Sequence, residues 1–342
     1  MRISVVIPVY NAQKTIARCV QGLQDLKLKP YEVIFVDNGS SDETVQLLQS
    51  LTEGWNCNVH IVHEITPGAA SARNTGADLA QGDWLAFTDS DCIPDVDWLT
   101  QGQIHIKKQQ CVAMAGPAWG TMEGDLSAQL LSLTTLSVGS EAHWRHDAGK
   151  TGVNGFASAN LWVNKQVFKQ VKGFDATLTV SGEDYDLCAR LYQTGHDIYY
   201  HPQLSVRHIH PSGFLSLLHK ASAYGKAHGF LFEKYGQSGL YVDGLGGKQF
   251  HVTASYKLWI NAVSAEKKMI VLLGFGFVWP VFWFVALIYP FFISRFLCRR
   301  AKALEQQLGL HQAYVLGWLL VFRSLAFTIG RMKGSRRGVW LL

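Results

Sequence analysis

The sequence lacks the paired cysteines of a disulfide framework or a zinc site. Its six cysteines include no C-x-x-C pair and no ligand-like cluster, so a reduced compartment is the simpler expectation. There is also no G-x-G-x-x-G after the first apolar run and no G-x-x-x-x-G-K-[ST] anywhere. These absences disfavour a dinucleotide-dependent oxidoreductase and a P-loop enzyme. The apolar run at residues 3–9 is too short for a signal peptide and contains Pro8, so we expect a buried strand there.

Acidic residues are scarce in the C-terminal part of the chain. The chain has 31 Lys and Arg and 26 Asp and Glu residues, yet eleven basic residues and a single acid, Glu305, lie from Lys267 onward. The protein is therefore an acidic body with a basic tail, and the basic residues flank apolar segments. This distribution favours membrane lipids, and not nucleic acid, as a partner.

Two apolar stretches lie within this tail. Residues 269–293 carry no charge but contain Pro280 and Pro290, which kink or break helices, and residues 313–329 are interrupted by Arg323. A fully helical first stretch is long enough for an apolar bilayer core of about 30 Å. Basic groups precede, separate and follow the two stretches, and the positive-inside rule would place all three groups on the cytosolic side. A re-entrant or in-plane first segment with an interfacial second one satisfies that rule; the alternative is two ordinary spans with a basic outer loop.

Strand and helix patterns alternate four times in the N-terminal part of the chain. The expected strands are residues 3–9, 32–36, 59–63 and 84–87, and the expected helices are residues 13–26, 43–51 and 69–79. Asn11 is expected to cap the first helix, and Ser40 with Glu43 to form a capping box for the second. This alternation predicts an α/β fold with an open, mostly parallel sheet, in which ligands bind beyond the carboxyl ends of the strands.

Polar side chains stand at the carboxyl ends of three of these strands. They are Tyr10, Asp37 and Asp89. Asp89 and Asp91 are one residue apart, so they face one point if the chain stays extended, and a turn still lets both reach it. Two such carboxylates need protons or a cation, for which magnesium or manganese fits best. The alternative is a solvated turn, and Asp37 is either a ribose-binding acid or a turn residue.

A second group of acids opens a helical pattern further along the chain. Glu183, Asp184 and Asp186 crowd its first turn, and Ser181 with Asp184 resembles a capping box. The acids either cap the helix, or one carboxylate faces the carboxyl edge of the sheet as a general base. The other expected elements are a helix over 126–138, a polar segment over 141–151, an apolar run over 155–163, strands over 196–201 and 204–206, and a helix over 214–235. Alternation places His208 and His210 on one side, as metal ligands or as an unliganded pair.

Five segments, taken in order, resemble the motifs of family 2 glycosyltransferases with the GT-A fold. They are SVVIPVYN at 4–11, VDNGSSDET at 36–44, ARNTGA at 72–77, DSD at 89–91 and GEDYD at 182–186. The resemblance covers about residues 1–235. It implies a GT-A type Rossmann-like sheet and an inverting transfer of a sugar from a nucleotide-sugar donor, with a UDP-sugar as the default.

The resemblance also implies roles for individual residues. The donor-binding residues would be Pro8, Tyr10, Asn11, Asp37, Arg73, Asn74, Asp89 and Ser90. The ligands of a divalent metal, magnesium or manganese, would be Asp89, Asp91 and His208, with Asp91 as the direct ligand. The general base would be Asp184, with Glu183 beside it. Such a metal offsets charge on the leaving diphosphate, and one base with one inversion requires no covalent intermediate.

One departure from the family pattern bears on the product. The chain has no Gln-x-x-Arg-Trp after the acid-rich helix, the mark of processive synthases in this family, so a single transfer is expected.

The expected division is a catalytic domain over 1–235, a linker over 236–266 and a membrane-associated helical region over 267–342. The acceptor would be a hydroxyl of a lipid-linked or cell-surface glycan, reached from a cytoplasmic catalytic domain. The alternatives are a sugar nucleotidyltransferase and a non-catalytic membrane-anchored scaffold.

Overall fold

The computed structural model describes residues 1–135, 139, 141–147, 149, 151–243, 249–261, 264–277, 279, 281–303, 306–335 and 339–341. These residues form two compact units. The N-terminal unit comprises Met1–Thr121, Leu136–Gly149 and Val153–Ile209, and the C-terminal unit comprises Met122–Thr135, Lys150–Gly152 and His210–Leu342. The helix Phe214–Tyr235 therefore belongs to the C-terminal unit, whereas the sequence division grouped it with the catalytic domain.

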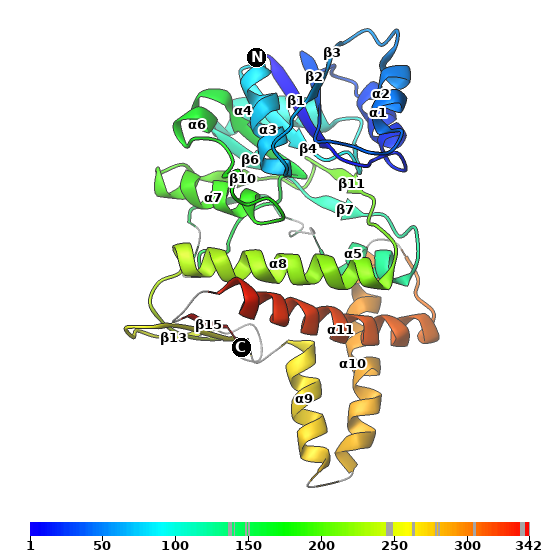
Figure 1. The fold of residues 1–342 in the computed structure, drawn as a ribbon, viewed down its shortest axis with the longest axis vertical. Helices are drawn as coiled ribbons and strands as arrows, with labels where there is room; N and C mark the ends of the chain where they lie inside the picture. Colours follow the sequence, from blue (N-terminus) through cyan, green and yellow to red (C-terminus); the bar gives the residue numbers. More distant parts are fainter. Residues whose placement is uncertain are drawn as a thin grey trace. The chain divides into compact units, whose positions relative to one another are not determined.

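The N-terminal unit is built on a mixed, eight-stranded sheet (Figure 1). Its strands are β1 (Ile3–Val9), β2 (Glu32–Asp37), β3 (Asn58–His63), β4 (Trp84–Thr88), β6 (Ala113–Ala115), β8 (His143–Arg145), β9 (Asn160–Asn164) and β10 (Ile198–Tyr200). They lie in the order β3-β2-β1-β4-β9-β6-β10-β8. The pairs β3-β2, β2-β1, β1-β4 and β6-β10 are parallel, while β9 runs antiparallel to β4 and β6, and β8 antiparallel to β10. The expected α/β fold with a large central sheet is confirmed.

Helices complete the two faces of this sheet. They are α1 (Ile16–Gln24), α2 (Thr44–Thr52), α3 (Ala69–Leu79), α4 (Trp98–Gln109), α6 (Lys165–Gln170) and α7 (Glu183–Gln193). Val5 and Ile7 of β1 belong to a hydrophobic cluster that includes α1, whereas Val6 belongs to a cluster that includes α3 and α7. Both faces of β1 are thus buried, which explains its unbroken apolar sequence.

A small second sheet brings a distant histidine to the end of β4. It has the order β5-β11-β7, with β5 (Cys92–Pro94), β11 (Val206–His208) and β7 (Ala118–Gly120). In the antiparallel pair of β5 and β11, His208 lies opposite Cys92. Strand β4 ends at Thr88, and Asp89 to Asp91 form the turn into β5. The chain turns at this point and does not remain extended.

All three helix caps expected from the sequence are wrong. Asn11 has a φ of 47° and its Oδ1 accepts a hydrogen bond from the Ser41 backbone N–H at 2.8 Å, while α1 begins only at Ile16. Helix α2 begins at Thr44, after Glu43, where Asp42 accepts from the Thr44 N–H at 3.1 Å. Helix α7 follows Gly182, whose φ is 96°, and no side-chain cap bond forms there.

Several other boundaries also differ from those expected. Helix α5 covers Leu126–Thr134, and residues 136–138 of the expected helix lie outside the described residues. The polar segment after Glu141 contains the edge strand β8. In the apolar run 155–163 the strand starts at Asn160, which is 1% exposed and forms the first residue of β9. Asn160 is tolerated there because its amide bonds to the carbonyl oxygen of Pro117 at 3.0 Å.

The C-terminal unit combines long helices with a four-stranded sheet. Its further helices are α8 (Phe214–Tyr235), α9 (Ala265–Gly276), α10 (Val281–Ala303) and α11 (Leu310–Gly334). The sheet has the order β13-β12-β14-β15, with β12 (Gly239–Asp243), β13 (Gln249–Val252), β14 (Lys257–Asn261) and β15 (Val339–Leu341). Three of these strands lie in residues 236–266, the segment expected to be a linker. Two segments, Phe282–Lys302 and Leu310–Gly334, are long and apolar enough to cross a membrane.

Candidate active site

Three of the expected site residues lie at one edge of the large sheet. Strands β2, β1 and β4 are neighbours, and their carboxyl ends carry Asp37, Tyr10 and Asp89. Tyr10 is 65% exposed, so its ring is available to a ligand. Pro8, within β1, is half-buried. This edge is where ligands bind in open α/β sheets.

Asp37 is held as an anion at this edge. It is 5% exposed, its Oδ1 accepts from the Ser40 backbone N–H at 3.1 Å, and its Oδ2 lies 3.0 Å from Nδ1 of His63. Burial by itself raises the pKa of Asp37, but the hydrogen bonds from Ser40 and His63 outweigh it and leave that pKa below the usual range. The carboxylate is therefore fixed in orientation and charged at neutral pH.

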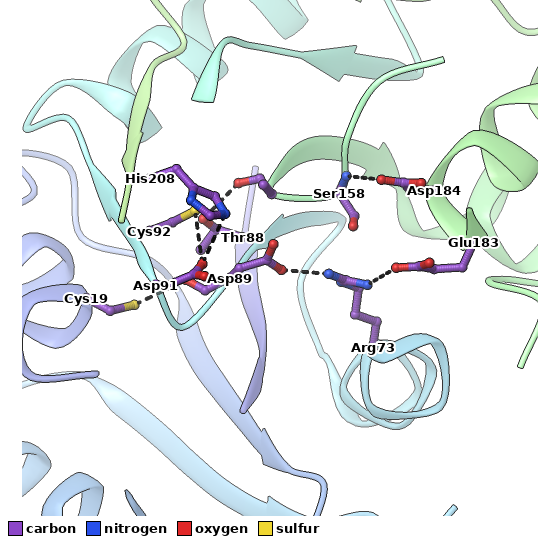
Figure 2. Close-up of polar contacts among 11 residues, drawn as sticks. Cys19, Arg73, Thr88, Asp89, Asp91, Cys92, Ser158, Glu183, Asp184 and His208 are labelled. Atoms are coloured by element: carbon purple, nitrogen blue, oxygen red, sulfur yellow. Dashed lines mark hydrogen bonds and ion pairs between the residues drawn. The ribbon is translucent and has the colours of Figure 1, made fainter. Parts of the chain in front are cut away.

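The turn between β4 and β5 brings potential metal ligands together. One ligand atom from each of Asp89, Asp91, Cys92 and His208 lies within 4.8 Å of the others. His208 Nε2 is 3.4 Å from Asp91 Oδ1 (Figure 2). The Asp91 carbonyl accepts from the Ile209 N–H at 2.8 Å. Burial and the two neighbouring carboxylates raise the pKa of the Cys92 thiol, so this thiol stays protonated. The two carboxylates and one imidazole that remain fit a magnesium or manganese ion.

Arg73, on α3, joins this turn to the acid-rich helix α7. Its side chain is almost completely buried, with Nη2 at 2.6 Å from Asp89 Oδ1 and Nη1 at 2.8 Å from Glu183 Oε1 (Figure 2). Burial alone lowers the pKa of Arg73, but the charges of Asp89 and Glu183 outweigh it and raise the pKa overall. One guanidinium thus neutralises two carboxylates from different elements and fixes both in place.

Asp184 stands beside this bridge and has an unusual acidity. Its Oδ2 accepts from the Ser158 backbone N–H at 3.3 Å and its Oδ1 from the Tyr185 N–H at 2.8 Å. Burial and the adjacent charge of Glu183 raise the pKa of Asp184 to about 7, although Arg73 opposes them. A carboxylate with a pKa near neutrality is suited to take a proton from a hydroxyl group.

The remaining expected site residues are placed as follows. Ser90 is half-buried in the turn between Asp89 and Asp91. Asn74 uses its amide to hold a backbone: its Nδ2 donates to the Phe174 carbonyl at 2.9 Å and its Oδ1 accepts from the Phe174 N–H at 2.8 Å. His210 is bonded to Thr135 within the C-terminal unit, at 3.3 Å from Oγ1 to Nε2.

Sequence reasoning missed two contacts of this site. It did not pair Arg73 with Glu183, and it did not identify Ser158, which is 3% exposed and whose backbone N–H contacts Asp184. No local signal reveals either contact, because the partners are far apart in the chain.

Comparisons with known proteins identify related sequences. Residues 4–161 match the family described as glycosyl transferase family 2. The chain is 29% identical to glycosyltransferase AglE of Haloferax volcanii over 66% of its own length and 72% of that protein. It is 30% identical to the pre-mycofactocin glycosyltransferase of Mycobacterium tuberculosis over 65% of its length, but it spans less than half of that protein, 46%.

A third relative has a lipid-linked substrate in its name. It is a dolichyl N-acetyl-alpha-D-glucosaminyl phosphate 3-beta-D-2,3-diacetamido-2,3-dideoxy-beta-D-glucuronosyltransferase of Methanococcus voltae, 24% identical over 68% of this chain and 74% of that protein. Among solved structures, a mannosyltransferase of Pyrobaculum calidifontis in complex with GDP-Man and Mn²⁺ superposes with a TM-score of 0.53. It is 18% identical and the match covers 69% of this chain and 65% of that one, so it supports the shared fold.

Proposed function

Because this chain carries a family 2 glycosyltransferase domain with a GT-A fold, we propose that it transfers a sugar from a nucleotide-diphosphate sugar to a hydroxyl group with inversion. Asp184 acts as the general base. It takes the proton of the acceptor hydroxyl while that oxygen attacks the anomeric carbon and the bond to the diphosphate breaks. No covalent sugar intermediate is required, by the logic of inverting glycosidases.

The observation that carries this proposal is the continuous set of contacts from Asp89 through Arg73 to Glu183, with Asp184 adjacent. The distances of 2.6 Å and 2.8 Å fix the aspartate turn to the first turn of α7. A metal-ligand cluster and a carboxyl group with a pKa of about 7 are therefore held on one rigid frame. Such preorganisation is what an attack on an activated sugar demands.

Three residues are suited to hold a divalent cation. Asp89 is committed to Arg73 through its Oδ1, which supports Asp91 as the direct ligand, with Asp89 and His208 contributing. A bound magnesium or manganese ion offsets charge on the leaving diphosphate. Asp37, Tyr10, Asn11, Pro8 and Ser90 line the donor side in this proposal.

The acceptor in this proposal is a lipid-linked or cell-surface glycan. The name of the Methanococcus voltae relative, a transferase for a dolichyl-phosphate-linked sugar, supports a lipid-linked acceptor. Two helical segments long and apolar enough to cross a membrane support attachment to the membrane. We place the catalytic domain on the cytoplasmic side, because the basic residues flank these segments, and we propose a single transfer per acceptor.

A donor panel tests this proposal. Detergent-solubilised full-length protein is incubated with UDP- and GDP-sugars in manganese, magnesium or EDTA, and release of nucleoside diphosphate is measured. Release from one donor with either metal, and none in EDTA, is the expected result. Asp91→Asn should remove the metal-dependent release, whereas Asp197→Asn, which changes a surface carboxylate bonded to His146, should retain it. Metal-independent release, or no release and no metal-dependent binding with any donor, would overturn the proposal.

A further inference from the structure

We propose that α9 and α10 enter one leaflet of an anionic lipid bilayer as a hairpin and return to the same side, so that they anchor the chain without crossing the membrane. This inference rests on the proposed membrane attachment and not on the transfer chemistry. The proposed partner of the apolar surface of this hairpin is lipid, and not another protein.

The hairpin exposes large apolar side chains along its length. Phe277, at the tip, is 81% exposed, Phe284 is 67% exposed and Trp279 is 57% exposed. Ring contacts join the two helices near the tip, with 5.5 Å between the centroids of Phe275 and Phe282. Figure 1 shows α9 and α10 side by side, ending in this tip. Exposed apolar surface of this extent marks an interaction surface.

The uncharged parts of the two hairpin helices are each too short to cross a bilayer. Helix α9 has 12 residues, which is about 18 Å, and the uncharged part of α10, residues 281–294, is about 21 Å long. A crossing requires about 20 apolar residues and 30 Å. The segment Phe282–Lys302 reaches the necessary length only because it includes Arg295, Arg299, Arg300 and Lys302.

The charges of the hairpin all lie at one end. Lys267 and Lys268 lie in the first turn of α9, where Lys267 pairs with Glu266 at 3.7 Å, whereas Arg295 and the basic residues after it lie in the last turns of α10. Because the two helices are joined at the tip and pack against each other, both basic ends lie at the base. The guanidinium carbon of Arg295 lies 5.9 Å from the ring centroid of Phe292, so its apolar stem packs on the aromatic surface one turn nearer the tip. Anionic headgroups complement such a basic base.

The other apolar helix, α11, is fastened to the protein. A Cβ on Gly330 would lie 2.1 Å from the Ser222 carbonyl oxygen of α8, so the two helix backbones are in contact. The Glu266 carboxylate at the start of α9 accepts hydrogen bonds from Ser324 and Thr328 of α11. Arg331 is 2% exposed, with its guanidinium 4.6 Å from the Trp259 ring. Because α8 and the base of the hairpin hold α11 along one side, α11 stays with α8 in this proposal and only the hairpin enters the bilayer.

Cysteine labelling on vesicles tests the inference. The full chain is synthesised in a cell-free system with vesicles of phosphatidylcholine and phosphatidylglycerol, recovered by flotation, and treated with a membrane-impermeant maleimide. Trp279→Cys reports the tip and Lys302→Cys the base, and the unsubstituted chain gives the background of the native cysteines. A pore-forming toxin then admits the reagent to the lumen without dissolving the bilayer.

We expect the base cysteine to be labelled from outside, and the tip cysteine to be labelled only after detergent is added. Labelling of the tip once the reagent enters the lumen would identify a span and overturn the inference. The inference would also be overturned if the chain did not float with the vesicles and its tip cysteine were protected from the maleimide even without vesicles. That result would identify a protein, and not lipid, as the partner of the tip.

A charge at the tip provides a second test. Phe284→Glu should weaken binding to the same vesicles by on the order of a hundredfold. The control Leu79→Glu, at the exposed end of α3, should leave binding unchanged. Release of nucleoside diphosphate in detergent should be equal in both variants, so loss of binding is distinguished from loss of the transferase. Equal vesicle binding by both variants would contradict the inference.

Discussion

At the scale of single residues, the site depends on one buried cation. Arg73 is 3% exposed and contacts Asp89 and Glu183, and each of these acids lies next to a residue proposed to act in transfer. A buried ion pair is worth little compared with apolar packing, but the loss of one member leaves an uncompensated charge. Arg73 therefore fixes the geometry of the site, and its removal should strongly destabilise the folded protein.

Arg73→Met should lower the free energy of unfolding by about 3 kcal/mol, because the buried Glu183 carboxylate and the half-buried Asp89 carboxylate would lose their common partner. Chemical denaturation in detergent measures this. The matched control is Arg2→Met, whose 3.6 Å pair with Asp83 is exposed on both sides and should lose less than about 1 kcal/mol. Equal losses of unfolding free energy in the two variants would show that the Arg73 ion pairs contribute no more to stability than an exposed surface pair.

The pKa of Asp184 predicts how transfer depends on pH. A general base must be ionised, and burial with the Glu183 charge raises the pKa of this carboxyl group from 3.8 to about 7. The rate should therefore rise with pH and reach half its maximum near pH 7, whereas an ordinary aspartate would be saturated well below that. Initial rates across the pH range measure the profile, and a rate that does not change between mildly acidic and mildly basic pH would contradict the assignment.

At the scale of elements, the helix pair α8–α11 relies on glycine. A Cβ at Gly330 would meet the Ser222 carbonyl oxygen and one at Gly334 the Lys226 carbonyl oxygen, both at 2.1 Å. Gly225 and Gly229 on α8 have similar backbone neighbours on α11. Such close backbone approach is the reason for small residues at these positions.

Gly330→Ala should lower the free energy of unfolding of the full chain by about 1–3 kcal/mol, since one of the helices must move away. Gly274→Ala is the control, because it lies within α9 with no atom within 4 Å of its Cβ position. In Gly274→Ala the higher helix propensity of alanine should raise the free energy of unfolding by up to about 1 kcal/mol. Calorimetry in detergent compares the two, and a stable Gly330→Ala protein would show that the α8–α11 contact is loose.

Elements whose signal is local were predicted well. The apolar runs that form β1 and β4, and the helix Phe214–Tyr235, lie within a residue of their expected bounds, because burial on both faces and amphipathic spacing are local properties. The caps failed for the opposite reason. Asn11 forms a bridge to Ser41, a contact with a residue on the next loop that local sequence does not encode.

At the scale of the whole molecule, the sequence predicted the class of fold and the meeting of three candidate residues at one edge of the sheet, but not the other contacts of the candidate site. The meeting of Tyr10, Asp37 and Asp89 follows from parallel strands in βαβ order. The insertion of antiparallel β9 between β4 and β6, and the arrival of His208 through β11, depend on strand pairing between distant segments. Such pairings are set by tertiary packing, which local patterns do not determine.

The measurement that tests the central claim most directly compares Asp184→Asn with Asp197→Asn in two assays. One assay measures nucleoside diphosphate release from the donor found in the panel, and the other measures binding of that donor. We predict that Asp184→Asn lowers release about 10²- to 10⁴-fold, the usual contribution of a general base, while donor binding stays at the parental level. Asp197→Asn should leave both unchanged. Release by Asp184→Asn at the parental rate, or an equal loss of donor binding, would contradict the account.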